Sequence, residues 1–415
     1  MPRRSLVAVP VLLIAVMSLL PAVPAGASFT ASAGKLAFRS TRDGNAQIYA
    51  AEADGSGPVN LSRSAGQEMD PAWSPDGTRI AYVRALRPGG RPDVFVMNAD
   101  GKGGTRLTTS TLAERQPAWS PDATRIAFIA RLSPEGPFHL FVMNADGTDR
   151  TRISAPPNGD DLSPAWSPDG SKIAFASTRA GGFPDIYTVA ADGSGLKRLT
   201  NDELIDGSPT GSPDGTRIAL ERCCAGGNSD IYVMNADGSG ETNLTLSAED
   251  ESHPAWSPDG LRIAYVGFPA GGGNRDIYVM NADGTSRAQV TSDPASDLAP
   301  SWEPVPVCTI GGTGGPDVLT GTDADDVICG RGGDDLIDGL SGSDLVIGGP
   351  GNDTLMGGDG NDDLQGDNGT DILNGGDHVA VHAVVPADRL TATIRGLQSI
   401  GATGILVTRI ERLVP

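Results

Sequence analysis

The sequence predicts an all-β protein, and two internal repeats of different length are the observations that predict it. The first repeat, of roughly 46 residues, begins near residue 34 and ends near residue 304. The second, of nine residues, begins at residue 312. The chain also contains 56 Gly and 31 Pro in 415 residues, which favours many short strands and turns over long helices.

The longer repeat contains four short phrases in a fixed order. In one copy they are PAWSPDG at 71–77, IAY at 80–82, DVFVMNADG at 93–101 and RLT at 106–108. Aromatic and β-branched residues favour the half-buried surface of a strand, whereas Ser-Pro-Asp-Gly and Asp-Gly favour tight turns. Six copies of four antiparallel strands predict a six-bladed β-propeller over residues 34–305.

The phase of this repeat predicts how the ring closes. The repeat region begins with a second strand, at Leu36, and ends with a first strand, at Trp302. We therefore expect the last strand to complete the first blade, which leaves no open sheet edge. Tryptophans recur where neighbouring blades should pack, and Gly211 interrupts their series, so we expect a looser contact there. The series is Trp73, Trp119, Trp166, Trp256 and Trp302.

In the shorter repeat, an aspartate and an apolar residue each recur every nine positions. The aspartates are Asp317, Asp326, Asp335, Asp344, Asp353, Asp362 and Asp371, and the apolar residues are Leu319, Ile328, Ile337, Val346, Leu355, Leu364 and Leu373. This pattern resembles the RTX nonapeptide repeat, and the resemblance implies that two nonapeptides form one coil of a short parallel β-roll over residues 308–377. Aspartates eighteen positions apart would then stack in two files, with the apolar file between them.

The acidity of this segment predicts a bound cation. Residues 308–377 contain fifteen Asp, no Glu and one Arg, a local net charge of −14 in a chain of formal net charge −21. Two carboxylates at the strand spacing of about 4.8 Å repel by roughly 1 kcal/mol even in bulk water. Ca²⁺ accepts oxygen ligands in flexible geometry, and Mg²⁺ fits worse. We predict at most five calcium sites between stacked aspartates, completed by carbonyls of the Gly-rich turns.

Both repeats resemble known families. The PAWSPDG and VMNADG phrases resemble the TolB-type repeat, a relative of WD-type repeats, which implies a six-bladed propeller. The nonapeptide resembles the RTX calcium-binding repeat G-G-x-G-x-D-x-U-x, which implies a calcium-loaded parallel β-roll with the seven aspartates as ligands. Several positions depart from the RTX pattern, and we expect them to weaken particular sites: Thr313, Pro316, Thr322, Ala324, Arg331, Leu340 and Asp367.

A carboxylate lies three residues before the Pro of each propeller repeat. The six are Glu68, Glu114, Asp161, Asp206, Glu251 and Asp297. One interpretation is a ring at a channel mouth that binds a cation or a basic peptide. The other, which we favour, is that each acid pairs with a nearby arginine or accepts loop amides, because structural ion pairs are common in such positions. The candidate arginines are Arg42, Arg131, Arg179 and Arg222.

The N-terminus and the cysteines predict export. Residues 1–27 have a basic start, an interrupted apolar stretch and a small-residue cleavage site, as in a signal peptide. Export permits disulfides, and we expect Cys308 to pair with Cys329. Cys223 and Cys224 are adjacent, and both a bridge and two thiols remain open for them. Residues 378–415 lose both repeats and stay unassigned.

These observations favour a non-enzymatic exported calcium-binding protein, located outside the cell, on its surface or in the periplasm. We expect its propeller to bind an extracellular or cell-envelope protein or glycan, and the mature chain to be a monomer without a membrane span. The acidic composition excludes nucleic acid as a partner. The alternative is an extracellular hydrolase or lyase with a metal at the channel mouth, although no G-x-S-x-G motif occurs.

Overall fold

The all-β prediction is confirmed by the computed structural model. It describes residues 34–87, 90–156, 158–223, 227–269, 271–304, 308–349, 351–366 and 369–375, and the backbone of 378–382. Over these ranges the chain forms strands and turns without an α-helix, so no described helix could cross a membrane. The expected signal peptide and residues 383–415 lie outside the described residues.

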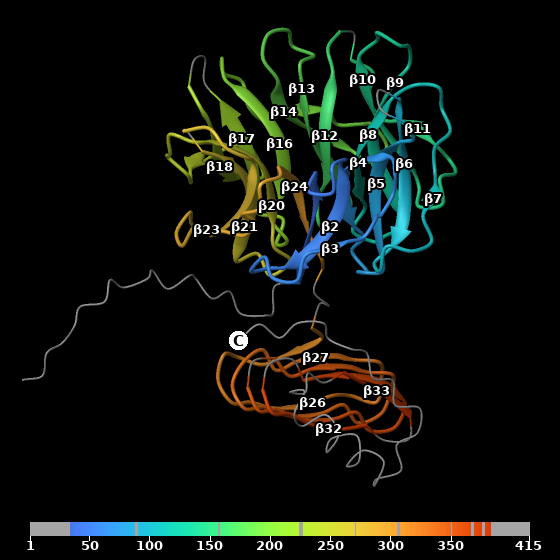
Figure 1. Ribbon diagram of the computed structural model, residues 1–415, viewed down its shortest axis with the longest axis vertical. Coiled ribbons are helices and arrows are strands. Elements are labelled where there is room, and N and C mark those ends of the chain that lie inside the picture. Colours follow the sequence, from blue (N-terminus) through green and yellow to red (C-terminus); the bar gives the residue numbers. More distant parts are fainter. Residues whose placement is uncertain are drawn as a thin grey trace, which may run out of the picture.

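Residues 35–302 form six four-stranded antiparallel sheets arranged as a propeller, in the upper part of Figure 1. The innermost strands are β4 (Gln67–Trp73), β8 (Glu114–Trp119), β12 (Asp161–Trp166), β16 (Ile205–Gly211), β20 (Asp250–Trp256) and β24 (Asp297–Trp302). The second strands are β1 (Lys35–Ser40), β5 (Arg79–Ala85), β9 (Arg125–Arg131), β13 (Lys172–Ser177), β17 (Arg217–Cys223) and β21 (Arg262–Phe268).

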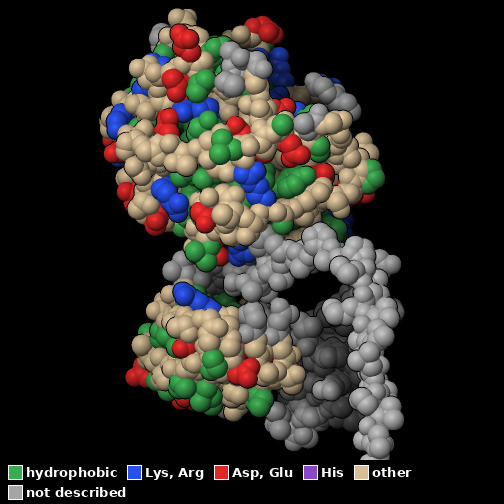
Figure 2. All heavy atoms as spheres, turned by 90° about the vertical axis from the view of Figure 1, so that its left-hand side faces the viewer, with side chains coloured by type: hydrophobic (Ala, Val, Ile, Leu, Met, Phe, Trp, Pro, Cys, Tyr) green, Lys and Arg blue, Asp and Glu red, His purple; other side chains and the backbone are tan. Residues whose placement is uncertain are grey.

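The two outer strands of each blade complete the sheets. The third strands are β2 (Gln47–Glu52), β6 (Pro92–Asn98), β10 (Phe138–Asn144), β14 (Asp185–Ala190), β18 (Ser229–Asn235) and β22 (Asp276–Asn281). The outermost strands have two residues each: β3 (Val59–Asn60), β7 (Thr105–Arg106), β11 (Thr151–Arg152), β15 (Lys197–Arg198), β19 (Thr242–Asn243) and β23 (Ala288–Gln289). On the face shown in Figure 2, acidic and basic side chains are interspersed over these blades.

The predicted closure of the ring is confirmed. Strand β24 pairs with β1, so that Leu36 lies opposite Trp302 and Ser40 lies opposite Asp297. The first blade therefore contains strands from both ends of the propeller segment, in the order β24-β1-β2-β3.

The Ser-Pro-Asp-Gly phrase forms the tight turn that follows β4, β12, β16 and β20, and Ser-Pro-Asp-Ala forms the turn after β8. In the turn after β4, Ser74 Oγ donates to Asp76 Oδ1 and accepts the backbone N–H of Arg79 at 2.9 Å. Gly77 completes the turn with a φ of 67°, which favours glycine. The hydroxyl of the serine two residues before the Asp and the backbone amide two residues after it lower the pKa of that Asp, to about 2 at Asp122, Asp169 and Asp214.

The tryptophans join neighbouring blades as expected. The indole N–H groups of Trp119, Trp166 and Trp302 donate to alanine carbonyls of the preceding blade at 3.0–3.2 Å. The cluster of Ala176, Ile186, Ile218, Leu220 and Met234, at the blade that carries Gly211, contains no tryptophan. This junction therefore lacks the indole contact that other junctions have.

The second part of the chain is a parallel β-roll of two sheets, in the lower part of Figure 1. One sheet contains β25 (Ile310–Gly311), β27 (Val327–Cys329), β29 (Leu345–Ile347), β31 (Asn361–Gln365) and β33 (His378–His382), and the other contains β26 (Val318–Thr320), β28 (Leu336–Asp338), β30 (Thr354–Met356) and β32 (Ile372–Asn374). Successive nonapeptides alternate between the sheets. Strand β33 continues the roll beyond the expected end at residue 377.

The predicted apolar file forms the interior of the roll. Ile328, Ile337, Val346, Leu355 and Leu364 are fully buried, and Leu319 and Leu373 pack at its two ends. The predicted disulfide between Cys308 and Cys329 is also present and ties the start of the roll to β27. Cys224 lies outside the described residues, so the pairing of Cys223 stays open.

Replacing Gly211 by tryptophan should stabilise the propeller. A Cβ on Gly211 would meet its nearest atoms, Pro168 Cδ and Trp166 O, at 3.9 Å, an ordinary contact distance. The added indole would bury apolar surface, which we expect to raise the free energy of unfolding by about 1–3 kcal/mol. Denaturant unfolding of Gly211→Trp against Gly211→Ala checks this. A tryptophan variant no more stable than the alanine variant would show that the junction has no room for the indole.

Candidate functional site

The structure places the seven aspartates of the roll in the two predicted files. Asp317, Asp335 and Asp353 each donate a backbone N–H to Oδ1 of the aspartate eighteen positions later, at 2.8, 2.8 and 3.0 Å. Asp326 and Asp344 do the same in the second file, at 2.9 and 3.0 Å. In the five later aspartates of the files, one side-chain oxygen is therefore fixed to the coil beside it by a backbone amide.

Four of these second oxygens are buried without a hydrogen-bond donor. They are Oδ2 of Asp335, Asp344, Asp353 and Asp362, in residues that are only 1–3% exposed. Burial raises the pKa of Asp335 and Asp344, and it raises that of Asp353 to about 6, with the stacked aspartates as a further cause. A buried carboxylate oxygen without a partner is costly, so these atoms are suited to a cation.

Backbone oxygens lie beside these carboxylates. Both Asp335 Oδ2 and the carbonyl oxygen of Gly348 lie within 2.6 Å of the point where a Cβ on Gly330 would sit. Asp344 Oδ2 and the Gly357 carbonyl converge in the same way over Gly339. A side chain at either glycine would fill this space, which explains the glycine of each nonapeptide.

This donor set fits calcium. Its ligands are all hard oxygens, and Ca²⁺ accepts mixtures of carboxylate, carbonyl and water oxygens in flexible geometry. Among the described residues, no three His, Cys, Asp or Glu side chains gather at one point. The remaining ligands of an ion would therefore come from backbone carbonyls and water.

The six acids of the propeller lie inside the blades and do not form an open ring at the channel mouth. Each is at most 2% exposed: Glu68, Glu114, Asp161, Asp206, Glu251 and Asp297. The favoured interpretation, pairing with arginine, is confirmed for Asp161 with Arg179, Asp206 with Arg222 and Asp297 with Arg42, at 2.5, 2.6 and 3.0 Å.

Two further acids pair with arginines that the sequence interpretation did not assign to them. Glu68 pairs with Arg84 at 2.7 Å, and Glu114 pairs with Arg150. The expectation that Arg131 pairs with one of the six acids was wrong, because its guanidinium donates instead to the carbonyl of Pro134 at 2.8 Å. Arg150 precedes β11 and lies 36 positions from Glu114, so proximity in the sequence did not reveal the pair.

Glu251 is the exception in this series. It lies opposite Gly267 in the sheet, where Glu68 and Asp206 have Arg84 and Arg222. Its Oε1 accepts from Ser247 Oγ at 2.6 Å, whereas its buried Oε2 has no donor. Burial raises the pKa of Glu251 as a result.

A different ring of side chains faces the channel, and the sequence analysis missed it. The residue before the proline of each innermost strand lies at a β-bulge with a φ of 47–54°, although none of the six is glycine. Positive φ is uncommon for such residues and marks a locally strained position. The six residues line a hollow of about 140 Å³ together with the prolines that follow them: Asp70, Gln116, Ser163, Ser208, His253 and Ala299.

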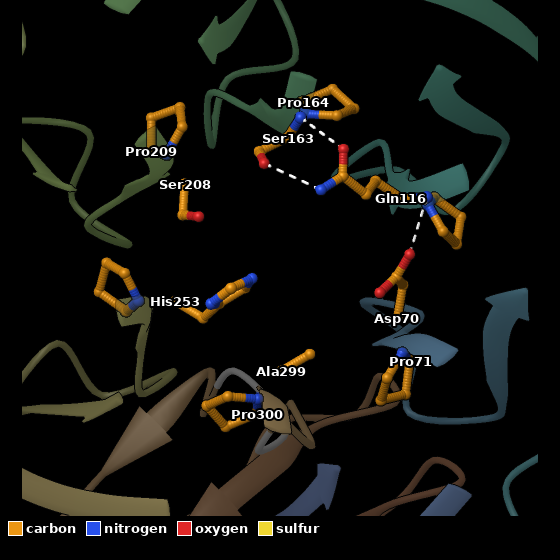
Figure 3. A pocket seen from close by; sticks show the side chains of 12 residues that line it. Asp70, Pro71, Gln116, Ser163, Pro164, Ser208, Pro209, His253, Ala299 and Pro300 are labelled. Carbon is orange, nitrogen blue, oxygen red and sulfur yellow. Dashed lines mark hydrogen bonds between the residues drawn. The ribbon is translucent and has the colours of Figure 1, made fainter. Parts of the chain in front are cut away.

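The channel hollow has an organised half and an open half (Figure 3). Gln116 Nε2 donates to Ser163 Oγ at 3.1 Å, and its Oε1 accepts the backbone N–H of Ser163 at 2.9 Å. Asp70 accepts the backbone N–H of Gln116 at 3.3 Å, and burial in the channel raises its pKa. His253, whose side chain is 45% exposed, points into the hollow from the opposite side. The hollow therefore offers both hydrogen-bond donors and acceptors to a ligand.

Comparison with known families assigns the propeller. The family model of the TolB beta propeller domain matches residues 15–134 and 50–252, which together make up more than half of the chain. The chain belongs to this family. The RTX calcium-binding nonapeptide repeat matches residues 311–346 and 347–377, so both resemblances seen in the sequence are confirmed.

The similar proteins cover only parts of this chain. TolB of the Tol-Pal system from Desulfosudis oleivorans is 45% identical over 56 residues, which make up 14% of this chain and 13% of that protein. The structure of TolB from Acinetobacter baumannii aligns with a TM-score of 0.58 and 26% identity over 66% of this chain and 68% of that chain. The chain thus spans about an eighth of the first of these relatives.

The C-terminal end resembles a third, unrelated family. The model of the HisG C-terminal domain matches residues 371–412. ATP phosphoribosyltransferase from Gemmatimonas aurantiaca is 63% identical to this chain over 38 residues, which make up 13% of that enzyme. Most of the matched segment lies outside the described residues. Sequence periodicity had left this tail unassigned because the segment contains no repeat.

The ion pairs of the propeller predict opposite effects for two substitutions. Arg222→Met should lower the free energy of unfolding by about 3–5 kcal/mol, because it leaves Asp206 buried without that cation. Glu251→Gln should raise the free energy of unfolding at pH 8 by less than about 1 kcal/mol, because it removes a buried charge with which no described arginine pairs.

The pH dependence of the Glu251→Gln effect distinguishes removal of a buried charge from a general change in packing. The pKa of Glu251 is raised in the folded state, so the native protein loses stability as the pH rises through that pKa. The gain from Glu251→Gln should therefore be present at pH 8 and largely lost at pH 4, where the glutamate is mostly protonated in both the folded and the unfolded state. Urea unfolding at both pH values measures it. An equal change in unfolding free energy at pH 4 and pH 8 would contradict the view that Glu251 is a buried unpaired charge.

Proposed function

We propose that this protein is an exported calcium-binding protein in which a propeller acts as a binding scaffold and the β-roll requires calcium for its order. The observation that carries the calcium part is the set of four buried aspartate oxygens without donors in the roll. The match of residues 311–346 and 347–377 to the RTX calcium-binding nonapeptide repeat also supports calcium. When bound, calcium would cancel the repulsion within the files.

The two oxygens of the aspartates in the roll would have different roles. From Asp335 onward, Oδ1 of each aspartate in the files accepts a backbone N–H of the preceding coil and holds that coil in register, and Oδ2 with the glycine carbonyls would hold the ion. The isoleucine, valine and leucine file is too thin to offset fourteen net negative charges alone. Order in the roll would therefore depend on calcium by mass action.

Export is supported by the disulfide and by the predicted signal peptide. A structural disulfide such as Cys308–Cys329 persists in oxidising compartments and is rare in the cytosol. Calcium is also available there at concentrations that suit weak extracellular sites.

The channel hollow supports the scaffold role of the propeller. Its mixed polar lining, with Asp70 and His253 on opposite sides, suits a ligand that presents a polar or charged group, such as a protein side chain or a glycan. Asp70→Asn with His253→Gln should release any partner captured through this hollow. Retention of that partner by the double variant would place its binding site elsewhere.

Calcium binding to the full-length mature chain tests the main proposal. Asp344→Asn and Asp353→Asn should each weaken calcium binding about tenfold or more, because ligand charge sets the affinity of such sites. Asp323→Asn, at an exposed aspartate outside the two files, is the matched control and should bind like the wild type. Isothermal titration calorimetry measures all three. Equal affinity in every variant would contradict the proposed role of the files.

A further inference from the structure

The turns of the roll are of two kinds, and their hydrogen bonds distinguish them. In the first two nonapeptides, Thr313 and Thr322 donate their backbone N–H groups to Oδ2 of Asp317 and Asp326, both at 2.6 Å. Their hydroxyls donate to the same oxygens at 2.9 and 2.8 Å. In the next four nonapeptides the corresponding Oδ2 has no donor. The first two carboxylates are thus satisfied by the protein itself.

The backbone explains this difference. The second position of the nonapeptide has a positive φ in the four open turns: Arg331 at 79°, Leu340 at 74°, Gly349 at 100° and Gly358 at 97°. Thr313 and Thr322 occupy the same position in the first two turns and are not in the left-handed region. Threonine is β-branched and strongly disfavours positive φ, so its amide is kept directed at the aspartate.

Two further interactions close the first coil of the roll, residues 308–329. The Cys308–Cys329 disulfide joins its ends. Thr309 Oγ donates to Asp326 Oδ1 at 3.1 Å and accepts the backbone N–H of Val327 at 3.0 Å. Asp326 therefore has donors at both carboxylate oxygens, in contrast to Asp344 and Asp362, which follow it in its file.

We infer that residues 308–329 form a coil that is ordered without calcium, in which threonine takes the place of the ion, and that calcium sites begin at Asp335. This inference rests on the proposed calcium role and refines it. The first coil presents a fixed parallel edge, β27, on which β29 can pair when calcium arrives. Ordering of the roll would then spread from the propeller side toward the C-terminus, with four described sites in place of the five expected from the sequence.

Hydrogen–deuterium exchange of the full-length chain, with its disulfide intact, tests this inference. In chelator, the amides of residues 309–329 should be protected while those of 330–366 exchange freely, and calcium should protect both segments. If the first segment exchanges as freely as the second in chelator, the inference is wrong although the proposed calcium role stands. If residues 330–366 do not respond to calcium, the proposed function itself fails.

Two substitutions isolate the threonines from the disulfide. Thr313→Gly with Thr322→Gly removes the hydroxyls and permits positive φ, so we expect residues 309–329 to lose protection in chelator and regain it with calcium. Native mass spectrometry should then show up to two more calcium ions per chain than in the wild type. Thr313→Ser with Thr322→Ser keeps the hydroxyls and should behave like the wild type. Unchanged protection and ion count in the glycine variant would overturn the inference.

Discussion

The stacking of carboxylates at the spacing of β-strands is the constraint on which the C-terminal β-roll depends. Parallel pairing places each aspartate beside the one eighteen positions later, and the backbone hydrogen bonds to Oδ1 hold it there. The side chains cannot move apart without breaking the sheet. Their charge must therefore be cancelled in place, either by a donor from the protein or by a cation from solution.

The propeller and the roll satisfy buried carboxylates in different ways. In the propeller, arginines of the same blade pair with most of the inner acids, as Arg179 does with Asp161. These pairs need nothing from solution. The roll has a single arginine among fifteen aspartates, and among its described turns the first two have internal donors whereas the next four do not. The acids paired with arginine in the propeller therefore have a partner without a bound ion, whereas the roll would respond to calcium.

Much of the fold followed from the sequence because both repeats are periodic. Three copies of PAWSPDG and three variants of it predicted the number of blades, and the phase of Leu36 and Trp302 predicted the closure of the ring. The channel ring that includes Asp70 and His253 was missed because its six positions carry different residue types, so that no recurring residue marks them in the sequence. The partner of Glu114 was missed because Arg150 lies 36 positions away in the sequence. The hydrogen bonds of Thr313 and Thr322 were missed because the sequence showed these threonines only as departures from the nonapeptide pattern.

Anomalous diffraction from crystals of the full-length protein grown with calcium tests the central claim most directly. The account predicts anomalous peaks beside Oδ2 of Asp335, Asp344, Asp353 and Asp362, with none beside Asp317 or Asp326, and loss of order in residues 330–366 after chelation. A roll that remains ordered over residues 330–366 in calcium-free crystals, without any ion between its aspartates, would contradict it.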